Sequence, residues 1–354
     1  MKKLLLLSVV VGSLYCVFKI ATLPPSTAPD LTAGPPLEAT TPTPTQKLAT
    51  QKKESILVPY WALGQYDIST IPYDTIYYFG LAVDEKGIVI NDPGYMNLAY
   101  TNCPNDKICV LVLRMLNNDA NKKILADPKL QTKIIDDSIT IANKYYYSGV
   151  ALDLELSELF NSEITTQITK FVQQYYTMLH KDYKTLSFIT YGDSYFRKRP
   201  FDTKSIGEST DEVMIMAYDF HKSYGEPGPN FSFDEKSKYG YDFKQMITDF
   251  SGDVSREKIT VIFGMYGYDW TLNKQGTPLK RAEAITLNQI TNSKFQITNQ
   301  YQNSNSKERR IEYIDQQKLK HVIWYENKES AEVKTQYLQE NGIGSVSYWA
   351  WGYF

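Results

Sequence analysis

The sequence predicts an α/β fold, a (β/α)8 TIM barrel from residue 55 to the C-terminus with a small α+β insertion after its seventh strand. Eight short apolar runs alternate with longer polar or helical stretches, which is typical of repeated strand-helix units. About 300 residues also exceed the roughly 250 that such a barrel needs. A doubly wound parallel sheet is the alternative. The runs are SILVPYW, TIYYFGLAV, KICVLVLRM, GVALDLEL, LSFITY, EVMIMAYDF, ITVIFGMYG and GSVSYWAWG.

Helices are expected between the strands where apolar residues recur at three- and four-residue intervals, because that spacing places them on one helix face. The interval after the third run holds such a face in Ile135, Ile139, Ala142 and Tyr146. The interval after the fourth run holds another in Ile164, Ile168, Phe171, Tyr175 and Leu179. Asn161 or Ser162 precedes the second face and is placed to cap that helix.

The longest interval between strands follows the seventh run, at about 270–327. It is polar and contains a short helical and a strand-like stretch of its own, so we expect an insertion that forms one wall of a cleft. The predicted domains are therefore a signal peptide or signal anchor at 1–23, a linker at 24–54 and the barrel with its insertion at 55–354.

The N-terminus carries the pattern of an export signal. Lys2 and Lys3 precede an uncharged apolar run from Leu4 to Phe18. Continued to Leu23, the segment reaches about 20 residues, so the sequence leaves open whether it is removed or stays as a membrane anchor. Residues 24–54 are rich in Pro and Thr and offer little to bury, which is typical of a disordered linker. We expect an extracytoplasmic protein, secreted or anchored at the outer face of the cytoplasmic membrane.

The composition favours a neutral partner. Lys plus Arg number 38 and Asp plus Glu number 40, so no overall field attracts nucleic acid, and we expect none as a partner. The 28 Tyr and 5 Trp are flat amphipathic side chains that stack on sugar rings as well as fill a core. The three His lie far apart and no zinc spacing is present, so we expect no metal and no cofactor. A monomer is the expected state.

Cys103 and Cys109 allow two interpretations. They could close a small disulfide outside the cytoplasm. Cys109 also lies inside an apolar run, and this position favours a free core residue.

Two carboxylates interrupt the fourth apolar run, GVALDLELSE. Side chains alternate along a strand, so Val150, Leu152 and Leu154 face one side while Ala151, Asp153 and Glu155 face the other. Asp153 and Glu155 then point into the barrel near the carboxyl end of the strand, where barrel enzymes place their chemistry. Their α-carbons are about 6 to 7 Å apart.

Two inward carboxylates in a low dielectric push their pKa values apart, so that one is ionised and one protonated. A general acid near neutral pH requires this arrangement. Acidic residues at strand ends also cap helices or pair with Lys, and this is the interpretation we favour for Glu158. Arg114 is a candidate for binding a substrate carboxylate, although a salt bridge is the favoured interpretation.

These residues resemble motifs of glycoside hydrolase family 18, the chitinase family. YSGVALDLEL is similar to the D-G-x-D-x-D-x-E signature of the fourth strand and supplies its last Asp, Asp153, and its Glu, Glu155. VMIMAYDF resembles the M-x-Y-D motif of the sixth strand, and GMYGYDW and GSVSYWAWG resemble the seventh and eighth. HVIWYENKES is similar to the bacterial spore-cortex hydrolase and lysosomal chitobiase branches. The likeness covers roughly residues 55–354.

The resemblance implies a retaining, substrate-assisted glycosidase. Glu155 would protonate the glycosidic oxygen while the substrate's 2-acetamido carbonyl attacks the anomeric carbon. Asp153 would hold the acetamido N–H and stabilise the oxazolinium intermediate, and Tyr218 would donate its hydroxyl to the acetamido oxygen. The remaining expected substrate-binding residues are Asp219, Met216, Tyr266, Trp349 as the hydrophobic floor, and Tyr60 at the rim.

Two departures from the family pattern keep alternatives open. The first two Asp positions of the signature are Ser148 and Ala151 here, and the S-x-G-G of the third strand is replaced near Leu113 and Arg114. We expect a hydrolase of β-1,4-linked N-acetylglucosamine units in peptidoglycan or chitin oligosaccharides. A non-catalytic, chitinase-like carbohydrate-binding protein is the main alternative, and a structural barrel without a sugar site is the third.

Overall fold

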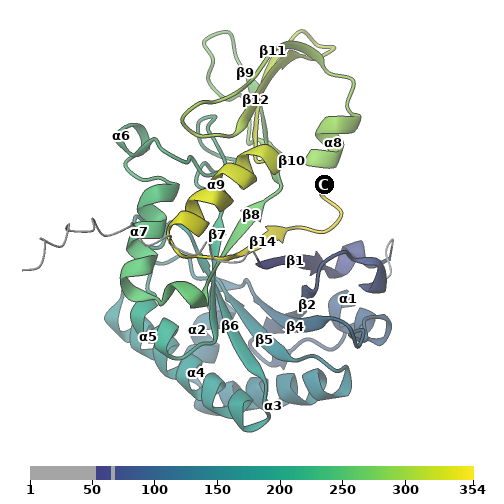
Figure 1. The fold of residues 1–354 in the computed structure, drawn as a ribbon, viewed down its shortest axis with the longest axis vertical. Coiled ribbons are helices and arrows are strands. Elements are labelled where there is room, and N and C mark those ends of the chain that lie inside the picture. The colour runs from purple at the N-terminus through teal and green to yellow at the C-terminus, as the bar shows by residue number, and fades with distance from the viewer. Residues whose placement is uncertain (1–52, 65–67) are drawn as a thin grey trace, which may run out of the picture. The chain divides into compact units, whose positions relative to one another are not determined.

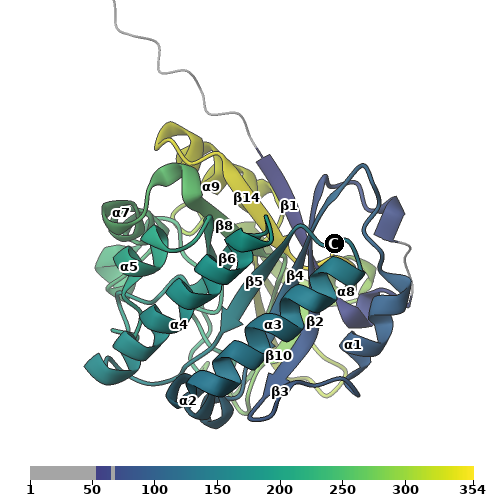
Figure 2. The ribbon, with the colours of Figure 1, turned by 90° about the horizontal axis from the view of Figure 1, so that it is seen from below.

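The computed structural model describes residues 53–64 and 68–354, and its centre is a closed barrel of eight parallel strands (Figures 1 and 2). Each of the eight apolar runs supplies one strand, which confirms the barrel and excludes the doubly wound sheet. Pairing of the first strand with β2 closes the ring. In their order around the barrel the strands are β1 (Lys53–Pro59), β14 (Ser345–Trp349), β8 (Ile259–Gly264), β7 (Glu212–Ala217), β6 (Thr185–Tyr191), β5 (Gly149–Leu154), β4 (Ile108–Met115) and β2 (Thr75–Asp84).

Helices of very different length connect the strands and cover the outside of the barrel (Figure 2). Longer ones are α2 (Asn118–Ala126), α3 (Pro128–Lys144), α4 (Ser162–Lys181), α7 (Phe243–Asp253) and α9 (Lys328–Glu340). Shorter elements are β3 (Gly87–Ile88), α1 (Pro93–Met96), α5 (Thr203–Glu208) and α6 (Lys236–Tyr239), with 3-10 turns at Tyr60–Ala62, Ile68–Thr70, Asn97–Tyr100 and Arg256–Lys258.

The two predicted helix faces are largely confirmed. Asn161 caps α4, because its side chain accepts the backbone N–H groups of Glu163 and Ile164. One prediction is wrong: Tyr146 lies beyond the end of α3 and is exposed. Its positive φ of 62° turns the chain towards β5, so it does not continue the buried face.

Strand alternation divides the core into two parts. Outward-facing residues such as Val150 and Leu152 pack under the helices in the larger cluster. Inward-facing residues such as Val112, Ala151 and Met214 fill the barrel itself. The alternation predicted for β5 is therefore confirmed. The next inward-facing position after Ala151 lies closer to the barrel mouth.

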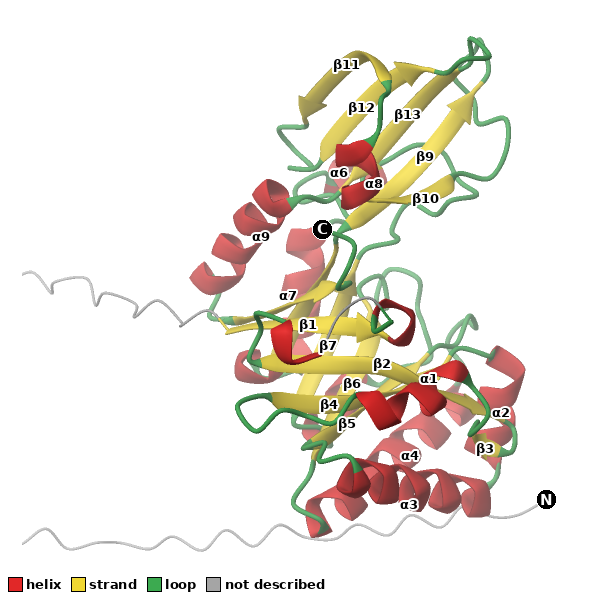
Figure 3. Ribbon diagram, turned by 90° about the vertical axis from the view of Figure 1, so that its right-hand side faces the viewer, coloured by secondary structure: helices red, strands yellow, loops and turns green. Residues whose placement is uncertain are grey.

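A five-stranded antiparallel sheet occupies the interval between β8 and α9 (Figure 3). It starts directly after the barrel strand, since only Met265 separates β8 from β9. Its strands, in sheet order, are β10 (Glu283–Thr286), β9 (Tyr266–Leu272), β13 (Lys320–Tyr325), β12 (Arg309–Ile314) and β11 (Gln296–Gln302), and α8 (Leu287–Asn292) follows β10.

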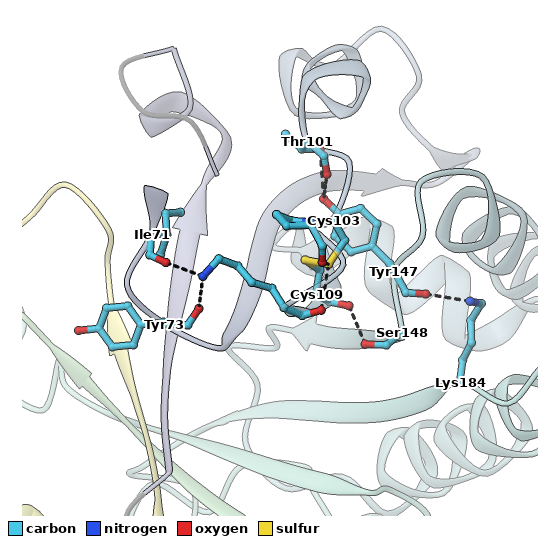
Figure 4. Close-up of a disulfide and its surroundings, with 10 residues drawn as sticks. Ile71, Tyr73, Thr101, Cys103, Cys109, Tyr147, Ser148 and Lys184 are labelled. Atoms are coloured by element: carbon cyan, nitrogen blue, oxygen red, sulfur yellow. Dashed lines mark hydrogen bonds between the residues drawn. A yellow bond between two sulfur atoms is a disulfide. The ribbon is translucent and has the colours of Figure 1, made fainter. Parts of the chain in front are cut away.

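Cys103 and Cys109 form a disulfide, with their α-carbons 5.8 Å apart (Figure 4). The favoured interpretation of Cys109 as a free core thiol is therefore wrong, although its burial in β4 is as expected. The loop before β4 folds back over the start of the strand. Lys107 holds it there by donating to the carbonyls of Ile71 and Tyr73, at 2.7 and 3.1 Å. This return of the loop, which the local pattern does not show, brings the two sulfurs together.

The expected membrane segment at 1–23 and all but the last two residues of the expected linker at 24–54 lie outside the described residues. Within the part of the chain that the structure describes, no helix has the length and apolar character needed to cross a bilayer.

Candidate active site

A cavity of about 290 Å³ lies at the carboxyl ends of the barrel strands. Seven of the eight predicted site residues line it: Asp153, Glu155, Met216, Tyr218, Asp219, Tyr266 and Trp349. The eighth, Tyr60, is not among the lining residues, because its ring packs against the Arg114 guanidinium, 4.6 Å from the ring centroid. The adjacent Trp61 lines the cavity instead and is 46% exposed.

Asp153 and Glu155 meet in this cavity because they are two residues apart, so that both side chains point into the barrel. Asp153 sits in register with Arg114 on one neighbouring strand and with Ile189 on the other. Glu155 follows the last residue of β5, and its carboxylate accepts a hydrogen bond from the Tyr191 hydroxyl at 2.9 Å. The acid is thus held by a donor from the end of the next strand.

Burial dominates the electrostatics of the pair. It raises the pKa of Asp153, and the negative charge of Glu155 raises it further, against the opposing effect of Arg114. Burial also raises the pKa of Glu155, while the Tyr191 hydrogen bond and the charges of Lys222 and Arg199 lower it. At least one proton is therefore retained on the pair at a higher pH than either carboxyl would hold alone in water.

One oxygen of Asp153 is available to a ligand. Its Oδ1 is buried and finds no hydrogen-bond partner among residues 53–64 and 68–354. An unpartnered buried acceptor is costly, so a native site that retains one suggests a function for it. A donor on a bound molecule, such as an amide N–H, would satisfy this oxygen.

Tyrosines and Asp219 form the wall opposite β5. Asp219 has a positive φ of 58°, and its Oδ1 accepts the hydroxyls of Tyr266 and, at 2.8 Å, Tyr268. Burial raises the pKa of Tyr218, so its hydroxyl stays protonated and can donate. The Tyr218 ring meets Tyr266 edge-on with centroids 5.9 Å apart, which restricts its orientation.

Asn230 fixes this wall to the insertion. Its side-chain oxygen accepts the backbone N–H of Asp219 at 2.8 Å, and its amide group donates to the carbonyls of Gly264 and Tyr266. The backbone N–H of Asn230 in turn donates to the buried carboxylate of Glu308. The position of Asp219 thus depends on a residue that precedes β12, far along the chain.

Aromatic rings form an apolar floor. The Trp349 ring lies edge-on to Phe79, with centroids 4.7 Å apart, and to Trp61, at 6.2 Å. Such a half-buried surface suits the apolar face of a pyranose ring.

Arg114 and Glu158 behave as expected from the sequence. Arg114 pairs with Asp92 at 2.6 Å, and Glu158 pairs with Lys122. Within the described ranges, no group of three or more His, Cys, Asp or Glu side chains is arranged to hold a metal ion.

Sequence reasoning missed Tyr191 and Tyr268. Tyr191 ends the LSFITY run and shares the inward parity of Ile189, so alternation would have pointed it into the barrel. The local pattern does not show that this strand lies beside β5, which leads into Glu155.

The model of the glycosyl hydrolases family 18 matches residues 95–353, which is most of the chain. The chain belongs to this family. The chain departs from the family signature at Ala151. This residue is fully buried among the apolar residues that fill the barrel. Of the four carboxylates in the family signature, the site keeps Asp153 and Glu155 at the barrel mouth and lacks the two at the Ser148 and Ala151 positions.

Three similar proteins illustrate the relationship. The uncharacterized glycosylase YvbX of Bacillus subtilis (strain 168) is 26% identical over 283 residues, which covers 77% of this chain and 78% of YvbX. The cortical fragment-lytic enzyme of Bacillus anthracis is 24% identical over 291 residues, 78% of this chain but only 64% of that enzyme. The crystal structure of the Bacillus cereus spore cortex-lytic enzyme SleL has the same fold, with a TM-score of 0.68 at 21% identity over 86% of this chain and 72% of SleL.

Proposed function

We propose that the protein hydrolyses β-1,4-linked N-acetylglucosamine-containing glycans by a retaining, substrate-assisted mechanism. The observation that carries the proposal is the shared cavity of Glu155, Asp153 and Tyr218, in which Asp153 Oδ1 has no hydrogen-bond partner in the described part of the chain. An acid, an acceptor for an amide N–H and a hydroxyl donor for an amide oxygen are the groups that an acetamido nucleophile needs.

In the first step Glu155, protonated, gives its proton to the glycosidic oxygen as the bond to the anomeric carbon breaks. The acetamido carbonyl oxygen attacks that carbon from the opposite face and forms an oxazolinium ion. Asp153 accepts the acetamido N–H and stabilises the positive charge, and Tyr218 orients the carbonyl oxygen. Glu155, now ionised, takes a proton from water, which opens the oxazolinium with net retention.

The other lining groups hold the same sugar. Asp219, oriented by Tyr266 and Tyr268, would accept a sugar hydroxyl, and Trp349 would support the apolar ring face. Met216 is buried and forms part of the cavity wall, so its thioether would contact the bound sugar.

Peptidoglycan is the preferred substrate and chitin oligosaccharide the second. The names of relatives that act on spore cortex support this choice. An extracytoplasmic location, secreted or anchored outside the cytoplasmic membrane, belongs to the same proposal, and the Cys103–Cys109 disulfide supports it because such bonds persist in oxidising compartments.

The test is turnover of purified peptidoglycan glycan strands and of chitin oligosaccharides. The wild type should release reducing ends, and Glu155→Gln should abolish release. Glu163→Gln, which changes an exposed carboxyl in the first turn of α4, is the matched control and should retain activity. Binding of acetylated sugars without turnover by the wild type would favour a non-catalytic carbohydrate-binding protein, which the missing carboxylate at Ala151 makes the second candidate.

A further inference from the structure

A second cavity, of about 630 Å³, lies beside the first, and Glu155 lines both. Three loops build it, those that follow β5, β6 and β7. Its lining combines basic residues with exposed apolar ones. The basic residues are Arg197, Lys198, Arg199 and Lys222, and the apolar surface comes mainly from Leu159, Phe196 and Tyr224.

The positive charge of this cleft is only partly neutralised. Arg197 and Arg199 share the single carboxylate of Asp193, with Nε to oxygen distances of 2.5 and 2.8 Å. Of the ion pairs formed within residues 53–64 and 68–354, none involves Lys198 or Lys222.

The acidic residues of the cleft do not supply the missing partners. Glu158 lines it but already pairs with Lys122 of α2. Glu155 is committed to the Tyr191 hydroxyl and is the proton donor of the proposed reaction. The cleft therefore presents a surplus of positive charge at one side of the acid.

The arrangement around Glu155 assigns a role to each cavity. The sugar whose acetamido group reacts must reach Asp153 and Tyr218, which line only the first cavity. The acid protonates the oxygen that links this sugar to the leaving group. The leaving group must then extend from Glu155 away from Asp153, and the second cavity is the space that lies there.

We propose that this basic cleft binds a carboxylate carried by the leaving-group part of the glycan, with Lys198 and Lys222 as the residues that select for it. The inference rests on the proposed function, since it takes Glu155 as the proton donor. It narrows the substrate to an acidic saccharide, because a neutral chitin chain offers these lysines no charge. In peptidoglycan the carboxylate could belong to a lactyl ether or to a peptide stem.

The exposed rings fit the same occupant. Phe196 is held by stacking on Tyr241, with centroids 5.4 Å apart, and Tyr224 is 74% exposed. A sugar or a lactyl methyl group could pack against them while its carboxylate meets the lysines.

A competing explanation is that the basic residues serve only to lower the pKa of Glu155, as Lys222 and Arg199 do. That role would affect every substrate equally, whatever its charge. Substrate preference therefore separates the two explanations.

Binding to the Glu155→Gln protein tests the inference without requiring turnover. The probes are a glycan tetrasaccharide with free lactyl carboxylates and no peptide, the same tetrasaccharide with those carboxyls reduced to alcohols, and one that retains its peptide stems. We expect calorimetry to show binding of an acidic form about tenfold tighter than the reduced form, and a preference that falls with added salt. Preference for the lactyl form alone identifies the ether carboxylate, and preference only for the stemmed form identifies the peptide.

The Lys198→Gln/Lys222→Gln double variant, in the same Glu155→Gln background, should bind acidic and reduced forms equally. Lys129→Gln, an exposed lysine on α3, is the charge-matched control and should keep the preference. Equal affinities of all three probes before any lysine is changed would overturn the inference, as would a preference that survives in the double variant. Hydrolysis of the acidic, peptide-free tetrasaccharide by the wild type, and its loss in Glu155→Gln, tests the proposed function separately, so either idea can fail alone.

Discussion

Three buried charged side chains connect α9 to the insertion, and they provide a quantitative test of the electrostatics. Lys334 lies between Glu308 and Glu326, and none of the three side chains is exposed. The ammonium also donates to the carbonyl of Phe231 at 2.8 Å. Burial raises the pKa of Glu326 to about 7, with the charge of Glu308 adding to the rise and Lys334 opposing it.

The energy follows from the difference between about 7 and the ordinary value of 4.5. At 1.36 kcal/mol per pH unit this corresponds to about 3 kcal/mol. Because the folded-state pKa of Glu326 is raised, its contribution to stability is fully present below pH 4.5 and is lost as the pH rises through about 7. Glu326→Gln keeps the size and an acceptor for Lys334 but removes the titration.

The assay is urea unfolding of the wild type and Glu326→Gln at a series of pH values from 4.5 to 8. The free energy of unfolding of the wild type should fall by about 3 kcal/mol more than that of the variant over this range. The exposed Glu257→Gln should follow the wild type. Parallel pH profiles for wild type and Glu326→Gln would show that Glu326 does not titrate with a raised pKa.

Three further predictions concern the site and the disulfide. Tyr191→Phe removes a hydrogen bond to the ionised Glu155 that is worth about 1.5–3 kcal/mol. The pKa of Glu155 should therefore rise and the basic limb of the kcat/KM–pH profile should move to higher pH; an unmoved limb would argue against the contact. Cys103→Ser should lower the free energy of unfolding by about 2 kcal/mol under oxidising conditions and by nothing in excess reductant, whereas an equal effect in both would mean that no disulfide forms. Ala151→Asp places a carboxyl beneath Asp153 and should shift the pH optimum, so an unchanged optimum would show that the missing carboxylate does not matter.

Local periodicity predicts the parts of the structure that depend on one segment at a time. The eight strands, the cap at Asn161 and the inward direction of Asp153 all follow from side-chain alternation or spacing. Family resemblance adds Tyr218, which directly follows β7, and Trp349, at the end of β14; the two meet only in the folded barrel.

Features that depend on which segments become neighbours are not visible in the sequence. The Tyr191 contact requires β6 to lie beside β5, and the disulfide requires a loop to fold back over β4. The sequence predicts Tyr60 at the site, yet the short 3-10 turn at the end of β1 directs Trp61 into the cavity and leaves Tyr60 against Arg114.

The buried group around Lys334 is the clearest example of a long-range dependence. Its members are Glu308 before β12, Glu326 after β13 and Lys334 in α9, and Glu308 supports the loop that orients Asp219 through Asn230. No spacing rule joins these positions in the sequence.

Whether Glu155 is the proton donor is tested by comparing the effect of Glu155→Gln on two substrates that differ only in their leaving group. The sugar that leaves from a glycan would depart as an alkoxide and needs a proton, whereas an acidic nitrophenol can leave without one. The value of kcat/KM reports the step in which that proton is transferred. If Glu155 donates the proton, kcat/KM should fall about 100- to 10,000-fold on the glycan and much less on the nitrophenyl glycoside. Equal losses on both substrates would show that Glu155 is not the proton donor.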